Sequence, residues 1–293
     1  MKPRHILLAL LVAAIWGINF SIIRIGLGSF PPLLLAALRF VIAAIPALFL
    51  PRPAVPWGRF VSIGLTLFFG QFALLFTGMA LGMPAGLASV VLQSQAFLTI
   101  LIAAAALGEK PTGRQVAGTL VAFAGLAVIA ETAGGSDFTV IGLVLSLGAA
   151  LCWAVGNVLL RGAGKVDMLA MVVWLSLIPP VPLLALSLLL DGPAVVGEAL
   201  IAIDWKGAGA VLYIAVLSTI LGFALWGQLL KRYPAATVAP FSLLVPIFGA
   251  ASAAIMLGEH FGPIRIAGMT LILAGLIVTV VPRHRAVRPQ MSG

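Results

Sequence analysis

Apolar residues in this chain gather into long segments, and every Asp and Glu lies outside them or, as Glu131 does, at an end. Ten such segments can be delimited, and a helix needs roughly 20 apolar residues to cross a hydrocarbon core about 30 Å thick. A helix also satisfies its own backbone hydrogen bonds in lipid. The pattern predicts an all-α polytopic membrane protein with ten transmembrane helices at about residues 6–27, 33–50, 60–80, 85–107, 114–131, 140–161, 168–190, 207–229, 236–257 and 263–281.

Composition agrees with that pattern. The 293 residues are 62% hydrophobic and only 9% charged, which is too little polar surface to cover a soluble globule of this length. The start of the chain imitates a signal peptide, with Lys2 and Arg4 before an apolar run. Because the run continues to about Ile25 and more spans follow, we expect no cleavage.

The net charge of +9 is placed asymmetrically. With a cytoplasmic N-terminus, 13 of the 17 Lys and Arg residues fall on the cytoplasmic side, and six of the eight acids fall outside. This bias predicts that both termini are cytoplasmic, including a tail at 282–293, in a bacterial inner membrane. The basic residues then face anionic lipid, and no nucleic-acid partner is expected. The four bases assigned to the outer half are Arg24, Arg39, Lys206 and Arg265.

An internal repeat is visible when the chain is shifted by 150 residues. Residues 84–130 then match 234–280 at 13 of 47 positions, including Pro84 with Pro234 and Gly108-Glu109 with Gly258-Glu259. A second shift, of 137, pairs Trp16 with Trp153. Two five-helix repeats, 6–131 and 140–281, are therefore predicted. Because five is odd, the second must be inverted in the membrane, an architecture typical of alternating access around a midplane site.

Several stretches resemble the drug/metabolite transporter superfamily, specifically its ten-helix members with two EamA-type repeats. They are Trp16-Gly-Ile-Asn-Phe, Leu38-Arg39-Phe40, Leu92-Gln93-Ser-Gln95-Ala-Phe97, Cys152-Trp153-Ala-Val-Gly-Asn157 and Pro240-Phe-Ser-Leu-Leu-Val-Pro246. The resemblance is strongest to the branch that exports O-acetylserine and cysteine. It implies a secondary exporter of small amino-acid metabolites, with other amino acids or amphipathic drugs as the alternative cargo.

Polar residues at mid-depth are the candidates for substrate binding. Trp16 and Asn19 share one helix face, and Trp153 and Asn157 recur in the other half. In one interpretation these pairs line a central cavity; in the other, each Asn joins helices and each Trp fills a gap. Gln71 and Gln95 are predicted to face the cavity, against the alternative of interhelical hydrogen bonds. Gln93 points about 200° away from Gln95, so both cannot face one small pocket.

Prolines and one arginine complete the candidate set. Pro240 and Pro246 each free a backbone carbonyl one turn earlier, either for the cavity edge or as a simple packing kink. We predict Pro246 to contact substrate. Arg39 could bind a carboxylate with its fork, or it could reach the membrane edge in a structural role. Gly118, Gly125, Gly268 and Gly275, spaced by heptads, are expected to allow close helix contact within the protein.

Catalytic motifs are absent from the sequence, as are ligand sets for a metal or a cofactor, so we expect neither an enzyme nor a cofactor-dependent protein. His5, His260 and His284 lie at membrane edges, and Cys152 is the single cysteine. A receptor is the rival class, and inverted duplication argues against it. Without an acid at mid-depth, we expect export without proton coupling, with exchange through Glu109 or Glu259 as the alternative. A monomer suffices for the pathway.

Overall fold

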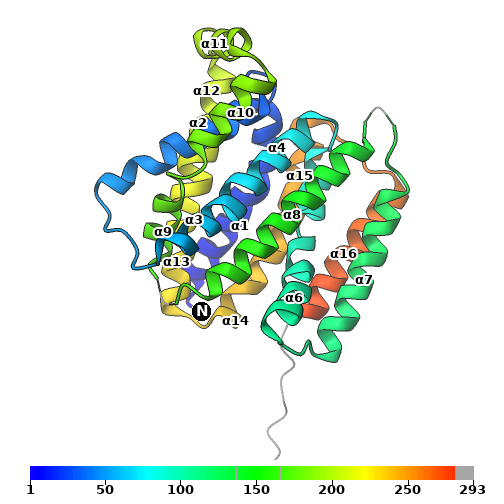
Figure 1. The fold of residues 1–293 in the computed structure, drawn as a ribbon. Helices are drawn as coiled ribbons and strands as arrows, with labels where there is room; N and C mark the ends of the chain where they lie inside the picture. The colour runs from blue at the N-terminus through cyan, green and yellow to red at the C-terminus, as the bar shows by residue number, and fades with distance from the viewer. Residues whose placement is uncertain (136, 165, 281–293) are drawn as a thin grey trace, which may run out of the picture.

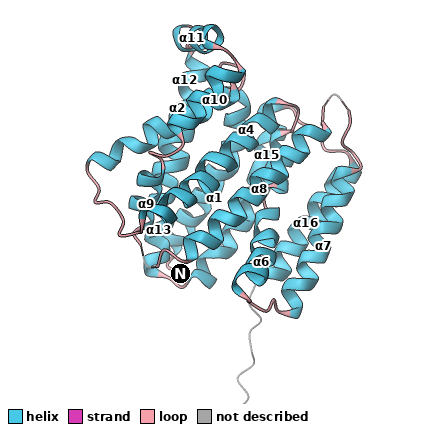
Figure 2. Cartoon of the chain, viewed as in Figure 1, coloured by secondary structure: helices cyan, strands magenta, loops and turns pink. Residues whose placement is uncertain are grey.

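The structure is a computed structural model that describes residues 1–135, 137–164 and 166–280 (Figure 1). Within these ranges every regular element is a helix (Figure 2). The predicted tail at 282–293 lies outside the described residues. The all-α polytopic fold of about ten membrane helices is confirmed, because eight segments have the length and hydropathy to cross a membrane and two shorter apolar segments accompany them.

The first half contains five such segments. They are α1 (Pro3–Gly26), α2 (Pro32–Ala44) with the 3-10 turn η1 (Ile45–Leu48), the run α3 (Trp57–Ile63), η2 (Gly64–Gly70) and α4 (Gln71–Ala80), the pair α5 (Ala85–Val91) and α6 (Ser94–Leu107), and α7 (Gly113–Ala130). The second predicted helix is shorter than expected because Pro46 converts its last turn to 3-10 geometry.

The second half repeats this order with one addition. It contains α8 (Val140–Arg161), α9 (Met168–Leu175) with α10 (Pro180–Leu190), α11 (Pro193–Ile201), the run α12 (Trp205–Leu212), η3 (Tyr213–Leu221) and α13 (Gly222–Arg232), the run α14 (Ala235–Val238), η4 (Ala239–Leu244) and α15 (Val245–Leu257), and α16 (Pro263–Val280). The sequence analysis missed α11, which occupies the connection that it left without structure.

Proline accounts for the interruptions in the second half. The seventh predicted span breaks between α9 and α10 at Pro179-Pro180, since Pro cannot donate the hydrogen bond that would continue α9. Pro240 and Pro246 lie in the first turns of η4 and α15, where the missing N–H groups are tolerated. The predicted ninth helix is therefore three short helices in sequence.

Two π-helical stretches, η2 and η3, lie at equivalent places under the 150-residue shift. Each belongs to a continuous apolar helical segment, Trp57–Ala80 or Trp205–Arg232. A π-helix has a wider turn than an α-helix and is frequently found at functional sites. Residues in and directly after these stretches contribute to the candidate site described below.

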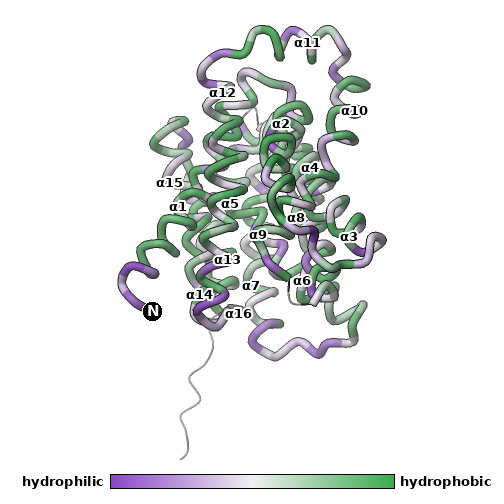
Figure 3. Tube along the Cα trace, turned by 90° about the vertical axis from the view of Figure 1, so that its left-hand side faces the viewer, coloured by the Kyte–Doolittle hydropathy of each residue, from purple (hydrophilic) through white to green (hydrophobic). Residues whose placement is uncertain are grey.

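Helix α1 runs through the middle of the bundle, in contact with α15, α5, α13 and η3. Helices α4 and α6 pack on α8, and α2 packs on α10. Hydrophilic segments gather at the two ends of the bundle, and the long helices between them are mostly hydrophobic (Figure 3). We call these ends the N-terminal end, which holds Met1 and α14, and the α11 end.

Candidate substrate-binding site

Trp16 of α1 anchors the first half of the site to η3. Its indole Nε1–H donates to the Ser218 carbonyl oxygen at 3.0 Å. The ring also packs on Phe223 and Trp226, with centroid separations of 5.1 and 5.2 Å. Gly222 makes room for this contact, since a Cβ atom there would lie 2.6 Å from Trp16 Nε1. The Trp therefore contributes both an aromatic surface and a fixed hydrogen bond.

Arg39 of α2 is buried, with 3% of its surface exposed. Its Nε–H donates to Thr219 Oγ1 at 2.9 Å, and its guanidinium carbon lies 4.4 Å from the centroid of the Phe72 ring. Nη1 is buried and has no hydrogen-bond partner. Of the two alternatives left open for Arg39, the one in which it reaches the membrane edge is wrong, because Thr219 of η3 and Phe72 of α4 enclose its side chain.

Asn19 lies one turn beyond Trp16 on α1 and is also buried. Its Oδ1 atom has no hydrogen-bond partner. Leaving a buried polar group unpaired costs about 1–3 kcal/mol, and more for a charged group. Asn19 and Arg39 thus place an unpaired acceptor and an unpaired donor in the interior of one bundle. Gln71, the first residue of α4 after η2, is also buried.

Asn157 and Gln95 contact each other across α8 and α6. Asn157 Nδ2 donates to Gln95 Oε1 at 2.8 Å and lies 3.4 Å from Thr99 Oγ1. The pair is only partly buried. In this conformation the two amides make the interhelical hydrogen bond that the sequence analysis kept as an alternative. Gln93 lies in the short break between α5 and α6 and is more buried than Gln95.

The last two predicted residues occupy different surroundings. Trp153 of α8 is partly buried and packs against the main hydrophobic core. Pro246 of α15 is buried, and its carbonyl oxygen lies 3.4 Å from Ser89 Oγ on α5. Gly17 and Gly249 let α1, α15 and α5 meet there, since a Cβ atom on Gly17 would lie 2.7 Å from the Val245 carbonyl oxygen. Substrate binding by the seven candidate residues stays a prediction.

Glu259 joins α15 to α5 at the α11 end of the bundle. Its carboxylate accepts hydrogen bonds from the backbone N–H groups of Ala85 at 2.7 Å and Gly86 at 2.9 Å. These are the first residues of α5, where unpaired N–H groups and the helix dipole favour an anion. The Gly258-Glu259 motif therefore joins the α11 ends of two segments that belong to different halves.

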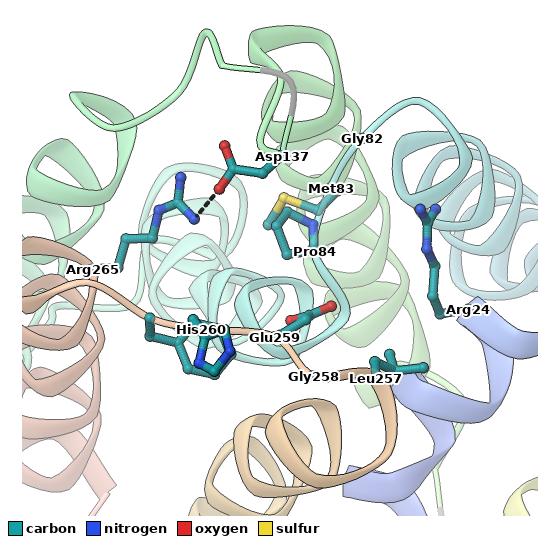
Figure 4. Close-up of a pocket in the computed structure, with 11 residues that line it drawn as sticks. Arg24, Gly82, Met83, Pro84, Asp137, Leu257, Gly258, Glu259, His260 and Arg265 are labelled. Atoms are coloured by element: carbon teal, nitrogen blue, oxygen red, sulfur yellow. Dashed lines mark hydrogen bonds and ion pairs between the residues drawn. The ribbon is translucent and has the colours of Figure 1, made fainter.

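A pocket of about 520 Å³ opens beside Glu259 (Figure 4). Arg265 Nη1 binds Asp137 Oδ2 at 2.6 Å on one side of it, and Arg24 lies on the other. The hydrogen bond from Arg265 holds the pKa of Asp137 below its ordinary value. The remaining lining residues include Gly82, Met83, Pro84, Leu257, His260 and Phe261.

Glu109, the counterpart of Glu259 in the repeat, has a different partner. Both of its carboxylate oxygens accept from Arg161 Nη1, at 3.1 and 2.9 Å, and both side chains are about half exposed. One Gly-Glu motif is thus docked on a helix N-terminus, and the other forms an exposed ion pair.

Metal-ligand clusters of three or more His, Cys, Asp or Glu side chains do not occur among the described residues.

The sequence analysis missed the helix-capping role of Glu259. The signal was present in the repeat, because Pro84-Ala85 and Gly258-Glu259 recur together, but only the packing of α15 on α5 joins them.

The sequence profile of the EamA-like transporter family matches residues 3–130 and again residues 140–281. The chain belongs to this family. It is accordingly a multi-pass membrane transporter, which implies a small-molecule substrate.

Alignments with similar proteins extend over nearly the whole chain. A "Probable amino-acid metabolite efflux pump" of Salmonella typhimurium is 46% identical over 96% of both chains, and one of Escherichia coli is 43% identical over the same shares. A "Probable terminal-alkyne amino-acid exporter" of Streptantibioticus cattleyicolor is 28% identical over 95% of this chain and 94% of that protein. A solved crystal structure with 22% identity has a TM-score of 0.63 over 95% of this chain and 98% of that one, which indicates a shared fold.

Proposed function

We propose that this EamA transporter exports small amino-acid metabolites, with cysteine and O-acetylserine as the first candidates, from the cytoplasm across a bacterial inner membrane. The two relatives named as amino-acid metabolite efflux pumps support the substrate class. The motifs quoted above support the narrower choice by resemblance. The relative named as an exporter of another amino acid supports the alternative that different amino acids are carried on the same scaffold.

The proposed mechanism is alternating access between two inverted halves, without ATP. One observation carries it: in this conformation the glutamates of the two repeated Gly-Glu motifs have different kinds of partner. Glu259 caps α5, and Glu109 pairs with Arg161. In an inverted repeat the same contacts recur at the opposite membrane face in the opposite state. If Glu259 released its helix start while Glu109 capped the equivalent one, a change that we call the cap exchange, one face would open and the other would close.

In this reading the conformation described here faces the cytoplasm. The α11 end is the outer face, where Glu259 holds α15 against α5. In the outward-facing state, Glu109 leaves Arg161 and caps the N-terminus of α14. The net effect is small for each carboxylate, because a charge-assisted bond to a helix start replaces an exposed ion pair. A small energy difference between two states is what a transporter cycle requires.

Symmetry-matched cysteine pairs test this mechanism. In a Cys152→Ala background, Pro84→Cys with His260→Cys reports on the Glu259 face, and Pro234→Cys with Lys110→Cys reports on the Glu109 face. A short bis-maleimide joins each pair only when that face is closed. We expect Glu259→Gln to lower cross-linking at the first pair and raise it at the second, and Glu109→Gln to do the reverse.

Glu198→Gln is the control, because this carboxylate lies in α11, away from both motifs. Unchanged cross-linking in both Glu variants would refute the cap exchange. The substrate is tested separately, by intracellular retention of a panel of labelled amino acids in cells with and without the protein. Equal retention of every amino acid in both strains would refute amino-acid export.

A further inference from the structure

We propose that Arg39 and Asn19 form a subsite for the charged end of a zwitterionic amino acid. The Arg39 guanidinium binds the carboxylate, and the Asn19 amide oxygen accepts a hydrogen bond from the ammonium group. This inference rests on the proposed function and adds the recognition chemistry of its substrate.

The first support is the complementarity of the unpaired atoms. Arg39 Nη1 is a buried donor without an acceptor, and Asn19 Oδ1 is a buried acceptor without a donor. A zwitterion carries an anionic acceptor and a cationic donor on adjacent carbon atoms. One such ligand offers both atoms a charged partner, whereas a simple anion offers only the acceptor and a simple amine only the donor.

The second support is the way Arg39 is held. Its one hydrogen bond among the described residues uses Nε, toward Thr219, which leaves the terminal nitrogens available to a ligand. A carboxylate commonly binds guanidinium through two parallel N–H donors. The Phe72 ring covers one face of the guanidinium and fixes its plane. The ion pairs among the described residues all involve other basic residues, so the buried Arg39 has no anionic partner there. A buried charge is costly unless it is paired, which favours binding of an anion.

The third support is that both residues are tied to one place in the fold. Arg39 bonds to Thr219, and Trp16 bonds to the adjacent residue, Ser218, both in the π-helix η3. Asn19 is one turn from Trp16 on the same face of α1. η3 therefore holds α1 and α2 through two neighbouring residues, Ser218 and Thr219.

The assignment predicts which ligands the transporter distinguishes. A ligand with both charged groups gains both contacts, and loss of either group removes one of them. L-cysteine, cysteamine and 3-mercaptopropionate share the thiol and differ only at the carboxylate and the amine. They separate the two contacts without changing the side chain.

The test is ligand-dependent thermal stabilisation of the purified full-length protein in detergent, with reductant, for these three thiols. We expect the wild type to bind L-cysteine most tightly. Arg39→Gln should weaken binding of L-cysteine and 3-mercaptopropionate at least about tenfold and leave cysteamine within about twofold, since it removes one charged hydrogen bond. Asn19→Ala should weaken L-cysteine and cysteamine but not 3-mercaptopropionate.

Two further variants separate recognition from folding. Arg39→Lys keeps the charge but not the planar fork, so it should fold and still lose part of the carboxylate preference. Arg59→Gln is the control, because Arg59 donates to the Gly162 carbonyl oxygen and lies outside the proposed subsite; it should retain the wild-type order of the three thiols.

Parallel weakening of all three thiols in Arg39→Gln would make Arg39 a structural residue and overturn the subsite. If that variant keeps the wild-type order while cells still export amino acids, the subsite is wrong and the proposed function stands. A wild type that exports no amino acid and ranks the three thiols equally would overturn both.

Discussion

Gly118 of α7 and Gly275 of α16 meet where these two helices cross, and neither position has room for a Cβ atom. A Cβ on Gly118 would lie 2.6 Å from the Gly275 carbonyl oxygen. Gly125 and Gly268 repeat this contact one heptad away, with 2.6 Å from a Cβ on Gly125 to the Gly268 carbonyl oxygen. The predicted close helix contact within the protein is confirmed.

This crossing gives a first prediction. Gly125→Ala should destabilise the folded protein by about 1–3 kcal/mol, because the added methyl group forces two packed backbones apart. The measurement is thermal unfolding in detergent, followed by the loss of monodisperse protein. Gly209→Ala is the control, since a Cβ atom on this helical glycine meets nothing within 4 Å. Equal stability of the two variants would contradict the role of the crossing.

The Asn157–Gln95 contact gives a second prediction. An interhelical hydrogen bond in a membrane protein averages only about 0.6 kcal/mol, so Asn157→Ala should leave the protein level nearly unchanged. If the amide contacts substrate during the cycle, export should fall about tenfold or more, because a hydrogen bond to a charged ligand group is lost. Export and immunoblots are measured in the same cells.

Ser176→Ala is a suitable control for that variant, because the Ser176 hydroxyl donates within its own helix, to the Val172 carbonyl oxygen. It should change neither quantity. A loss of protein in proportion to the loss of export would assign Asn157 a purely structural role.

Membrane orientation gives a third prediction. Reporter fusions near Asp137 and Asp191 should read periplasmic, and those near Arg59, Lys165 and Arg288 cytoplasmic, because basic residues favour the cytoplasmic side. The expected pattern would place Glu259 at the outer face, as the cap exchange requires. The reverse pattern would invert the direction of the proposed cycle.

Asp137 gives a fourth prediction. Because its pKa is lowered in the folded protein, the ion pair with Arg265 adds stability at neutral pH that is lost as the pH falls through the folded pKa. The wild type should therefore lose stability on acidification below about pH 4 more steeply than Asp137→Asn. The difference in Tm near pH 7 should be on the order of 1 °C, since Asp137 is largely exposed. Identical pH profiles would show that the pair adds nothing.

Energy coupling gives a fifth prediction. Carboxylates Glu109 and Glu259 lie at the ends of the bundle, engaged with Arg161 and with α5, and not at mid-depth. In proteoliposomes, cysteine flux down its own gradient should persist after the pH gradient and the membrane potential are collapsed. Uphill flux driven by an imposed pH gradient and abolished by Glu109→Gln would establish proton exchange instead.

The sequence by itself determined that the protein lies in a lipid membrane, that it is built of helices, and that it contains an internal duplication. Lipid accepts only segments that are long, apolar and internally hydrogen-bonded, so the ten spans could be delimited from residue order alone. The irregular backbone around Pro240 and Pro246 followed from their missing backbone donors. The glycine heptads pointed to close contact, because only small residues let two helix backbones approach.

Tertiary structure alone decided which side chains meet. The sequence left two roles open for Arg39, and in the structure its side chain is buried and donates to Thr219 of η3, 180 positions away in the chain. Asn157 donates to Gln95, and Glu259 accepts from the first residues of α5, so both contacts join segments that are distant in the chain. Periodicity gives the face of a helix but not its neighbour. A buried polar group chooses its partner by hydrogen-bond geometry across helices, which only the packed bundle defines.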